Sequence, residues 1–463
     1  MYQKNDELVV TITDVGTNGE GIGKVTGFTL FIKDAIIGDE VRVKIMKTKK
    51  NYAFAKLLEV ITPSKHRVEP ICEVARQCGG CQLQAMDYET QLQFKEAKVY
   101  NNIKRIGGLD SCQIEMHPII ASPKTLNYRN KAQFPVGKNA DGNIVYGFYA
   151  GRTHSIIESG DCKLGICPDG VDVNAKVMET IKTFMEVQGI EPYDEESHSG
   201  LVRHVLIRIG EKTKQVSVCI VINGNEIPNA EYLTQRLLEI PGVCDISVNI
   251  NKERNNVIMG LHTNQLYGPG YIEDYMDEVK FRISPQSFYQ VNPYSTELLY
   301  RKALEYADLT GKEIIWDLYS GIGTISLFLA QDAKKVIGVE IVPDAVSDAK
   351  INAEINGIGN VEFLEGAAED IVPKYFSENP DAEGCKPDVI VVDPPRKGCD
   401  MKLLKTMIEM NPERIVYVSC DSATLARDIS LLSMSGYRMK EMTPVDMFPQ
   451  TVHVETVVLM EKQ

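Results

Sequence analysis

Short apolar runs separated by glycine-containing turns fill residues 8–60 of the chain. The runs are rich in β-branched residues and the turns recur at short intervals, which is typical of a small β-barrel. The polar, proline-containing stretch ITPSKHRVEP follows, and its composition indicates a linker. The pattern therefore predicts a first domain over residues 1–61.

The rest of the chain divides into two patterns. A helix is predicted from Tyr88 to Ile106, and strands are predicted at residues 130–137, 204–210 and 216–223, so residues 62–280 are expected to form an α+β domain. Strand and helix patterns alternate over residues 281–463, which predicts an α/β domain with a doubly wound, Rossmann-like sheet. A length of 463 residues fits three domains.

Composition and the N-terminus bear on where the protein works. Hydrophobic residues make up 43% and charged residues 25%, as in ordinary soluble proteins. No apolar run approaches the ~20 residues that a membrane span needs, and the start, MYQKNDE, lacks an apolar signal core. We therefore expect a cytoplasmic protein without a membrane partner.

Charge is distributed unevenly. The net charge of -14 argues against a general coat for nucleic acid, but the first 70 residues hold 11 Lys and Arg against 9 Asp and Glu. Five lysines there surround Tyr52 and Phe54, which suits charge contacts and base stacking on RNA. A solvated hairpin rim is the equally simple alternative. The lysines are Lys44, Lys47, Lys49, Lys50 and Lys56.

A glycine turn joins a strand to a helix within EIIWDLYSGIGTISLFLA, residues 313–330. Gly321 and Gly323 allow the backbone to bend sharply and approach a ligand. The next strand ends at Glu340, where an acidic side chain can accept hydrogen bonds from a ribose. The third glycine of the dinucleotide fingerprint is missing, which favours S-adenosylmethionine over NAD. A Rossmann-type fold without this cofactor is the alternative.

Three later strands each deliver a chemical group. PDVIVVDPPRKG ends at Asp393, RIVYVSC ends at Cys420, and TVHVETVVLME contains Glu455. In open α/β sheets, ligands bind at the carboxyl ends of the strands, so Asp393 and Cys420 are expected at one edge. Asp-Pro-Pro also occurs in methyltransferases that act on amino groups of nucleic acids, and it is otherwise an ordinary strand-end turn.

A thiol and a carboxylate beside a methyl donor suggest one reaction in particular. Carbon 5 of uracil is a poor nucleophile, but addition of a thiolate at carbon 6 makes carbon 5 electron-rich. A carboxylate can then remove the carbon-5 proton so that the thiol is eliminated. Taken singly, Cys420 could be an inert buried cysteine and Glu455 a solvated strand residue.

Six motifs carry a family resemblance: SFYQVNP, DLYSGIGTISL, IGVE, VVDPPRKG, YVSCDSATLARD and HVETV, in this order. They closely resemble the RNA (uracil-C5)-methyltransferases of the TrmA/RumA type, over essentially the whole chain. The resemblance implies Cys420 as the nucleophile and Glu455 as the general base. Asp393 and Gln290 would also lie near the target base. The cofactor contacts that it implies are Gln290, Tyr319, Thr324, Glu340 and Asp393, with Thr324 standing where some members have asparagine.

Cysteines form a cluster in CEVARQCGGCQLQ, which contains Cys72, Cys78 and Cys81. Disulfides are improbable in such a chain, and four thiolates could hold zinc or an iron–sulfur cluster, while a redox Cys-x-x-Cys is the competing interpretation. The resemblance implies a 4Fe-4S cluster with Cys162 as the fourth ligand; Cys167 is the local rival. The cluster would be structural or contact RNA, because no step of the proposed chemistry needs an electron.

The N-terminal barrel resembles a TRAM domain, an RNA-binding module related in shape to OB-folds. NYRNKAQF resembles the family's central motif, so Arg129 and Lys131 are candidate phosphate contacts, or simply exposed strand charges. The leading hypothesis is a monomeric 23S ribosomal RNA (uracil-C5)-methyltransferase. The alternatives are a transfer-RNA enzyme of the same type, an amino-group methyltransferase and a non-catalytic iron–sulfur RNA-binding protein.

Overall fold

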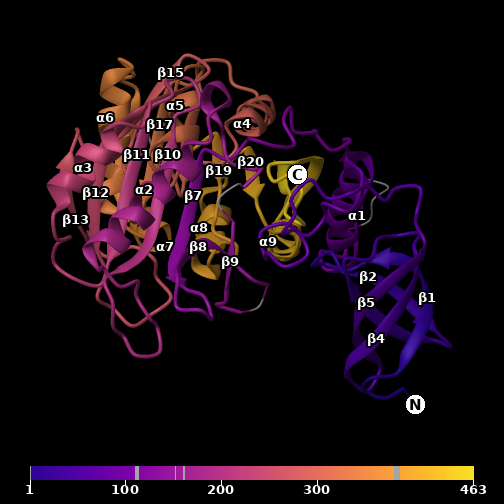
Figure 1. Ribbon diagram of the computed structural model, residues 1–463. Helices are drawn as coiled ribbons and strands as arrows, with labels where there is room; N and C mark the ends of the chain where they lie inside the picture. The colour runs from indigo at the N-terminus through magenta and orange to yellow at the C-terminus, as the bar shows by residue number, and fades with distance from the viewer. Residues whose placement is uncertain (1, 110–113, 152, 160–161, 380–385) are drawn as a thin grey trace.

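The computed structural model describes residues 2–109, 114–151, 153–159, 162–379 and 386–463. Its first five strands close into a barrel in the order β1-β2-β3-β5-β4, drawn in indigo at one end of the molecule (Figure 1). Alternate side chains of β4, from Val41 to Ile45, fill the barrel core, so the period-two pattern closes the barrel as predicted. The strands are β1 (Glu7–Val15), β2 (Gly21–Val25), β3 (Phe28–Lys33), β4 (Glu40–Thr48) and β5 (Tyr52–Thr62).

A seven-stranded sheet follows, in the order β13-β12-β11-β10-β7-β8-β9. Helices α2 and α3 pack against it through one apolar core that includes Val177 and Leu237. The predicted central strands are confirmed as β7, β10 and β11. Its elements are β7 (Lys131–Lys138), β8 (Ile144–Tyr149), β9 (Ile156–Glu158), a 3-10 helix (Pro168–Gly170), α2 (Val173–Gln188), β10 (Val202–Ile209), β11 (Val216–Ile222), α3 (Ala230–Leu238), β12 (Val243–Ile250) and β13 (His262–Tyr267).

The C-terminal part contains an eight-stranded sheet in the order β18-β17-β16-β19-β20-β22-β21-β6. The first five strands are parallel, and β22 runs antiparallel to both β20 and β21. The predicted doubly wound α/β domain is confirmed. Its elements are β14 (Ile272–Met276), β15 (Val279–Ile283), α4 (Pro293–Ala307), β16 (Ile314–Leu318), α5 (Thr324–Leu329), β17 (Lys335–Glu340), α6 (Pro343–Ile355), β18 (Val361–Glu365), α7 (Ala368–Glu378), β19 (Val389–Val392), α8 (Met401–Met410), β20 (Arg414–Ser419), α9 (Ser422–Met434), β21 (Tyr437–Val445) and β22 (Glu455–Lys462).

Helices cover both faces of this sheet, which explains the continuous apolar runs of its strands. In β20, Val416 and Val418 belong to one core, whereas Ile415 and Tyr417 belong to the core on the other face. Successive side chains of a strand point to opposite faces, so a strand buried on both sides shows no polar alternation. Central strands are thus fixed in place, and their carboxyl ends form a rigid edge.

The first helix, α1 (Tyr88–Arg105), packs against α9 and joins the core of the C-terminal sheet through Val99 and Ile103. The short strand β6 (Glu115–Met116) then adds to the same sheet beside β21. The contacts of α1 and β6 therefore cross the predicted boundaries 62–280 and 281–463. No described helix has the length and apolar character to span a membrane.

Candidate active site

The carboxyl ends of β16, β17, β19 and β20 meet at one edge of the C-terminal sheet, as parallel strands require. A cavity of about 590 Å³ lies at this edge, and we call it the catalytic cavity. Six of the seven residues predicted to hold cofactor or do chemistry line it. They are Gln290, Tyr319, Glu340, Asp393, Cys420 and Glu455.

Cys420 lies between the end of β20 and the N-cap of α9, Asp421. Its thiol is partly buried, and burial raises its pKa to about 12, with the Glu455 and Asp393 carboxyls adding to the rise and Arg396 opposing it. Burial of an ionisable group disfavours the charged form, and so do nearby like charges. The thiol is therefore protonated in this environment and needs a positive partner to react as a thiolate.

Glu455 begins β22, which pairs antiparallel with β20 so that Ser419 faces Thr456. This register places Glu455 next to Cys420 at the end of the sheet. Glu455 is only 3% exposed, and burial followed by the charge of Asp393 raises its pKa well above the usual range. Burial and the charge of Asp317 also raise the pKa of Asp393, to about 7. Two carboxyls thus share this pocket and hold protons to unusually high pH.

Glu340 is held in place by the backbone. Its Oε2 accepts a hydrogen bond from the Gly321 N–H at 3.0 Å, and its Oε1 accepts one from Val342 N–H at 2.9 Å. The turn before it requires unusual backbone conformations: Tyr319 has φ 71° and Gly323 has φ 83°. Both carboxylate oxygens have lone pairs left for further donors, such as ribose hydroxyls.

Thr324, the seventh predicted residue, does not line the catalytic cavity. It is the first residue of α5, and its hydroxyl accepts a hydrogen bond from the Tyr300 hydroxyl at 3.0 Å. Gln290, in contrast, lines the cavity while its backbone carbonyl accepts from the Asn130 side chain at 2.9 Å. The structure therefore brings Gln290 to the site and does not bring Thr324.

Asp317, below the cavity edge, is a buried carboxyl that accepts a hydrogen bond from the Ser326 hydroxyl at 2.5 Å. Burial raises its pKa from 3.8 to about 7, so the native state holds a proton that the unfolded chain loses. Stability from this proton is present at low pH and is lost as pH rises from 4 towards 7.

We therefore expect Asp317→Asn to become more stable relative to the wild type as pH rises from about 5 to 7.5, by about 2–4 kcal/mol. Urea unfolding at the two pH values measures this change. Asp344→Asn, at an exposed position on α6, serves as the control and should show no such gain. An equal pH response of both variants would contradict the expectation.

Comparisons with known proteins agree with this geometry. A family model described as tRNA (Uracil-5-)-methyltransferase matches residues 271–463, and a TRAM domain model matches residues 3–58. RNA methyltransferases named as uncharacterized from Clostridium tetani and Halalkalibacterium halodurans are each 47% identical over 459 residues, which is 99% of this chain and 97% of theirs. This chain belongs to the tRNA (uracil-5-)-methyltransferase family.

A solved structure extends the comparison to the whole fold. The Pyrococcus abyssi tRNA (uracil-54, C5)-methyltransferase, in complex with S-adenosyl-L-homocysteine, is 27% identical to this methyltransferase. The match covers 98% of this chain and 100% of the other, with a TM-score of 0.77. The methyltransferase thus shares its barrel, central sheet and C-terminal sheet with that enzyme.

A second cavity of about 470 Å³, which we call the cysteine cavity, is lined by Cys72, Cys78, Cys81 and Cys162. Burial raises the pKa of Cys81 to about 12, and nearby Cys162 and Cys78 add to the rise. Cys167 does not line this cavity; its thiol contacts the backbone carbonyl of Gly165 at 3.6 Å. The four predicted ligands therefore line one cavity, and the local rival lies outside it.

The two cavities share one wall, formed by Arg396, Phe448 and His453. Sequence reasoning did not single out these side chains. A signal existed for two of them, because Arg396 follows the Asp-Pro-Pro turn and His453 lies two residues before Glu455. The predicted phosphate contacts Arg129 and Lys131 also line the cysteine cavity.

The barrel faces the loop of residues 72–81, which we call the cysteine loop, across a third cavity of about 540 Å³. On the barrel side, Phe31, Lys33 and Phe54 line this cavity. The Tyr52 and Phe54 rings pack edge to face, with centroids 5.7 Å apart. Lys47, Lys49, Lys50 and Lys56 are exposed, and Lys44 is half-buried. Of the predicted basic and aromatic side chains, Phe54 lines this cavity, and four of the five lysines are exposed on the barrel.

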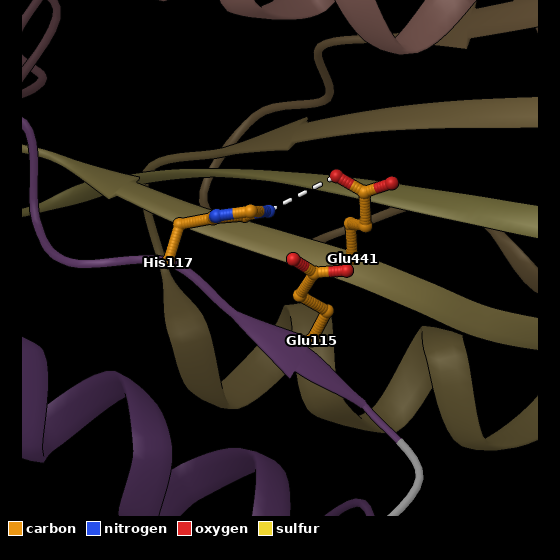
Figure 2. Close-up of side chains that lie close together, drawn as sticks. All are labelled: Glu115, His117 and Glu441. Atoms are coloured by element: carbon orange, nitrogen blue, oxygen red, sulfur yellow. Dashed lines mark hydrogen bonds and ion pairs between the residues drawn. The ribbon is translucent and has the colours of Figure 1, made fainter.

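Another group of potential metal ligands lies at the β6 edge of the sheet: Glu115, His117 and Glu441 (Figure 2). Their ligand atoms lie within 4.8 Å of one another, and His117 Nε2 is 3.0 Å from Glu441 Oε2. Glu441 also lies 4.0 Å from the Lys440 ammonium. None of the three lines the catalytic cavity, and Glu441 pairs with both His117 and Lys440 at the sheet edge.

Proposed function

We propose that this methyltransferase adds a methyl group to carbon 5 of uridine in RNA through a covalent bond to Cys420. The observation that carries the proposal is that Cys420, Glu455 and Asp393 line one cavity together with Glu340. Methyl transfer to an amino group needs no thiol, so the thiol at this position favours carbon-5 chemistry. S-Adenosylmethionine is the methyl donor implied by the fold, and it supplies an electrophilic methyl group on a positively charged sulfur.

Each step uses a residue of this chain. The Cys420 thiolate bonds to carbon 6 of a uracil flipped out of its stack, and the displaced electron pair moves onto the carbonyl oxygen at carbon 4. Carbon 5 of this enolate attacks the donor methyl group, the bond between that methyl group and the donor sulfur breaks, and S-adenosylhomocysteine leaves. Glu455 then takes the proton from carbon 5, the carbon 5–carbon 6 double bond re-forms, and the thiolate leaves. Glu455 finally releases that proton to solvent.

The surroundings of Glu455 suit a general base. A carboxyl with an ordinary pKa is a weak base at neutral pH, whereas one raised by burial and by Asp393 accepts a proton more readily. Gln290 and Asp393 lie in the same cavity and are assigned to the target base and the donor. Tyr319 and Glu340 are assigned to the adenosine part of the donor.

We further propose 23S ribosomal RNA as the substrate. A cysteine cavity that adjoins the catalytic cavity and a TRAM barrel that faces the cysteine loop support a large folded RNA target. The relative from Pyrococcus abyssi is named for uracil 54 of transfer RNA, which is the alternative. The enzyme would act as a cytoplasmic monomer. Nucleoside mapping of both RNAs from a strain lacking the gene tests this: loss of 5-methyluridine from 23S RNA is expected, and loss from transfer RNA alone would contradict it.

The cysteine cavity is proposed to hold a 4Fe-4S cluster. The donor set fits, because four thiols line one cavity and the Cys78 sulfur already accepts a hydrogen bond from the Gly80 N–H at 3.3 Å. When bound, the cluster would supply a covalent brace between the loop at residues 72–81 and Cys162. No proton or electron transfer in the methylation steps passes through these cysteines.

Cys162→Ser is expected to lower iron and sulfide content to below about a quarter of the wild-type content, because one of four ligands is lost. Cys167→Ser is the matched control, because Cys167 lies outside the cavity. This variant should retain the metal. Iron and sulfide analysis of protein purified without oxygen measures both. Equal metal loss in the two variants would contradict the assignment of Cys162 as a ligand. Zinc instead of iron in the wild-type protein would contradict the assignment of an iron–sulfur cluster.

A further inference from the structure

The surroundings of Cys420 oppose the thiolate that the proposed reaction requires. Glu455 on β22 and Asp393 at the end of β19 lie near the sulfur, and ionisation of either carboxyl disfavours the thiolate. The positive N-terminal end of α9 offers little help, because the Asp421 carboxylate already caps it, accepting from Ala423 N–H and Thr424 N–H. A positive group must therefore come from another element.

Arg396 is the arginine that lines the catalytic cavity. Its positive charge lowers the pKa of the Cys420 thiol and of the Glu455 carboxyl, against the larger effect of burial. The structure gives its guanidinium no hydrogen bond or ion pair with any described side chain. Lys98 on α1 and His453 also face it, and Lys98 donates to the Val452 carbonyl at 2.9 Å.

The Arg396 loop is fastened to the helix that follows Cys420. Pro394 and Pro395 restrict the backbone before it. The Thr424 hydroxyl donates to the Arg396 carbonyl at 3.1 Å, and the Arg427 guanidinium donates to the Lys397 carbonyl at 3.0 Å. Thr424 and Arg427 belong to α9, so the loop and the nucleophile are held by one rigid unit.

The backbone of this loop is also tightly packed. At Gly398, with φ +77°, an added Cβ would come within 2.6 Å of the Asp428 carboxylate. Asp428 in turn accepts from the Cys399 N–H at 2.9 Å and from the Tyr417 hydroxyl of β20 at 2.7 Å. Strand β20, helix α9 and the loop therefore share one buried anchor, which fixes the backbone that carries the exposed Arg396 side chain relative to the strand end that carries Cys420.

We propose that Arg396 is a positioning residue that stabilises the Cys420 thiolate electrostatically as it attacks the pyrimidine. This inference rests on the proposed function and assigns a role in it to a residue outside the predicted set. The charge acts before methyl transfer, on the formation of the covalent bond. It also keeps Glu455 available as a carboxylate when the carbon-5 proton is removed.

Arg396→Gln, Arg396→Lys and the control Lys405→Gln test the proposal; Lys405 is exposed on α8 and outside the cavity. The measurement is the rate of covalent adduct formation with saturating 5-fluorouridine RNA and S-adenosylmethionine between pH 6 and 10. We expect Arg396→Gln to move the midpoint of the profile up by about one unit and to slow the reaction at pH 7.5 about tenfold. Arg396→Lys should have a midpoint close to that of the wild type, and Lys405→Gln should match the wild type.

Alkylation of Cys420 by iodoacetamide without RNA gives a second measurement, read by mass analysis of the peptide that carries it. Slower alkylation in Arg396→Gln supports the proposal. An unchanged pH midpoint with weaker RNA binding would overturn it and make Arg396 a phosphate contact. Absence of an adduct in the wild type would instead overturn the proposed function, while slower alkylation in the variant would still support the effect of Arg396 on the thiol.

Discussion

Cys420→Ala is expected to reduce 5-methyluridine formation to below about a thousandth of the wild-type rate and to eliminate the covalent RNA adduct. Without the sulfur, carbon 6 receives no nucleophile and carbon 5 stays too electron-poor to attack a methyl group. The variant should keep its fold and its donor binding, because no hydrogen bond from this thiol to another described residue holds β20 to α9. Methyl transfer from labelled S-adenosylmethionine to RNA measures the loss, and calorimetry measures donor binding.

Cys244→Ala is the matched control for this change. Cys244 lies on β12 of the central sheet and lines neither the catalytic nor the cysteine cavity. The Cys244→Ala variant should methylate RNA at the wild-type rate. Undiminished methylation by Cys420→Ala would remove the covalent mechanism, and tight RNA binding without methylation by the wild type would favour a non-catalytic RNA-binding protein.

Glu455→Gln is expected to slow turnover about 100- to 1,000-fold while letting a methylated RNA–protein adduct accumulate. Glutamine has nearly the same shape but cannot take the carbon-5 proton, so elimination of the thiol stalls. Glutamine also cannot ionise beside Cys420, so the thiolate is not disfavoured and adduct formation itself should not slow. Gel analysis under denaturing conditions, with single-turnover kinetics, separates the two steps.

Glu461→Gln provides the control on the same strand, since Glu461 lies far from the cavity and pairs with Lys440 at 2.8 Å. It should turn over normally and accumulate no adduct. Rapid, complete turnover by Glu455→Gln would rule out Glu455 as the proton acceptor. A failure to form any adduct would instead place Glu455 in the addition step.

Strand-end positions could be predicted from the sequence because they follow from local pattern. The apolar runs before Asp393 and Cys420 fix strands β19 and β20, and parallel strands bring their ends to one edge. Thr324 shows the limit of such reasoning. Its motif position predicts a cofactor contact, but the turn through Gly323 directs its hydroxyl to Tyr300. Side-chain direction at a helix start depends on backbone angles that composition does not reveal.

Contacts between distant segments also could not be predicted from the sequence. The helix at Tyr88–Arg105 was expected, but its docking on α9 depends on tertiary packing and on the buried pair of Lys95 with Asp446, whose charged atoms lie 2.5 Å apart. Arg396 belongs to a sequence motif, but its position between the two cavities depends on the packing of its loop against α9. Sequence patterns therefore predicted which elements form, and the fold determined which side chains meet.

The covalent mechanism rests on a bond between the sulfur of Cys420 and a pyrimidine ring. The most direct measurement is tandem mass analysis of the wild-type enzyme after incubation with 5-fluorouridine RNA and S-adenosylmethionine, because fluorine at carbon 5 blocks the final proton removal. We expect a nucleotide that carries an added methyl group to be attached to the peptide that contains Cys420. A bond to another residue, or product nucleosides methylated on nitrogen with no adduct, would contradict it.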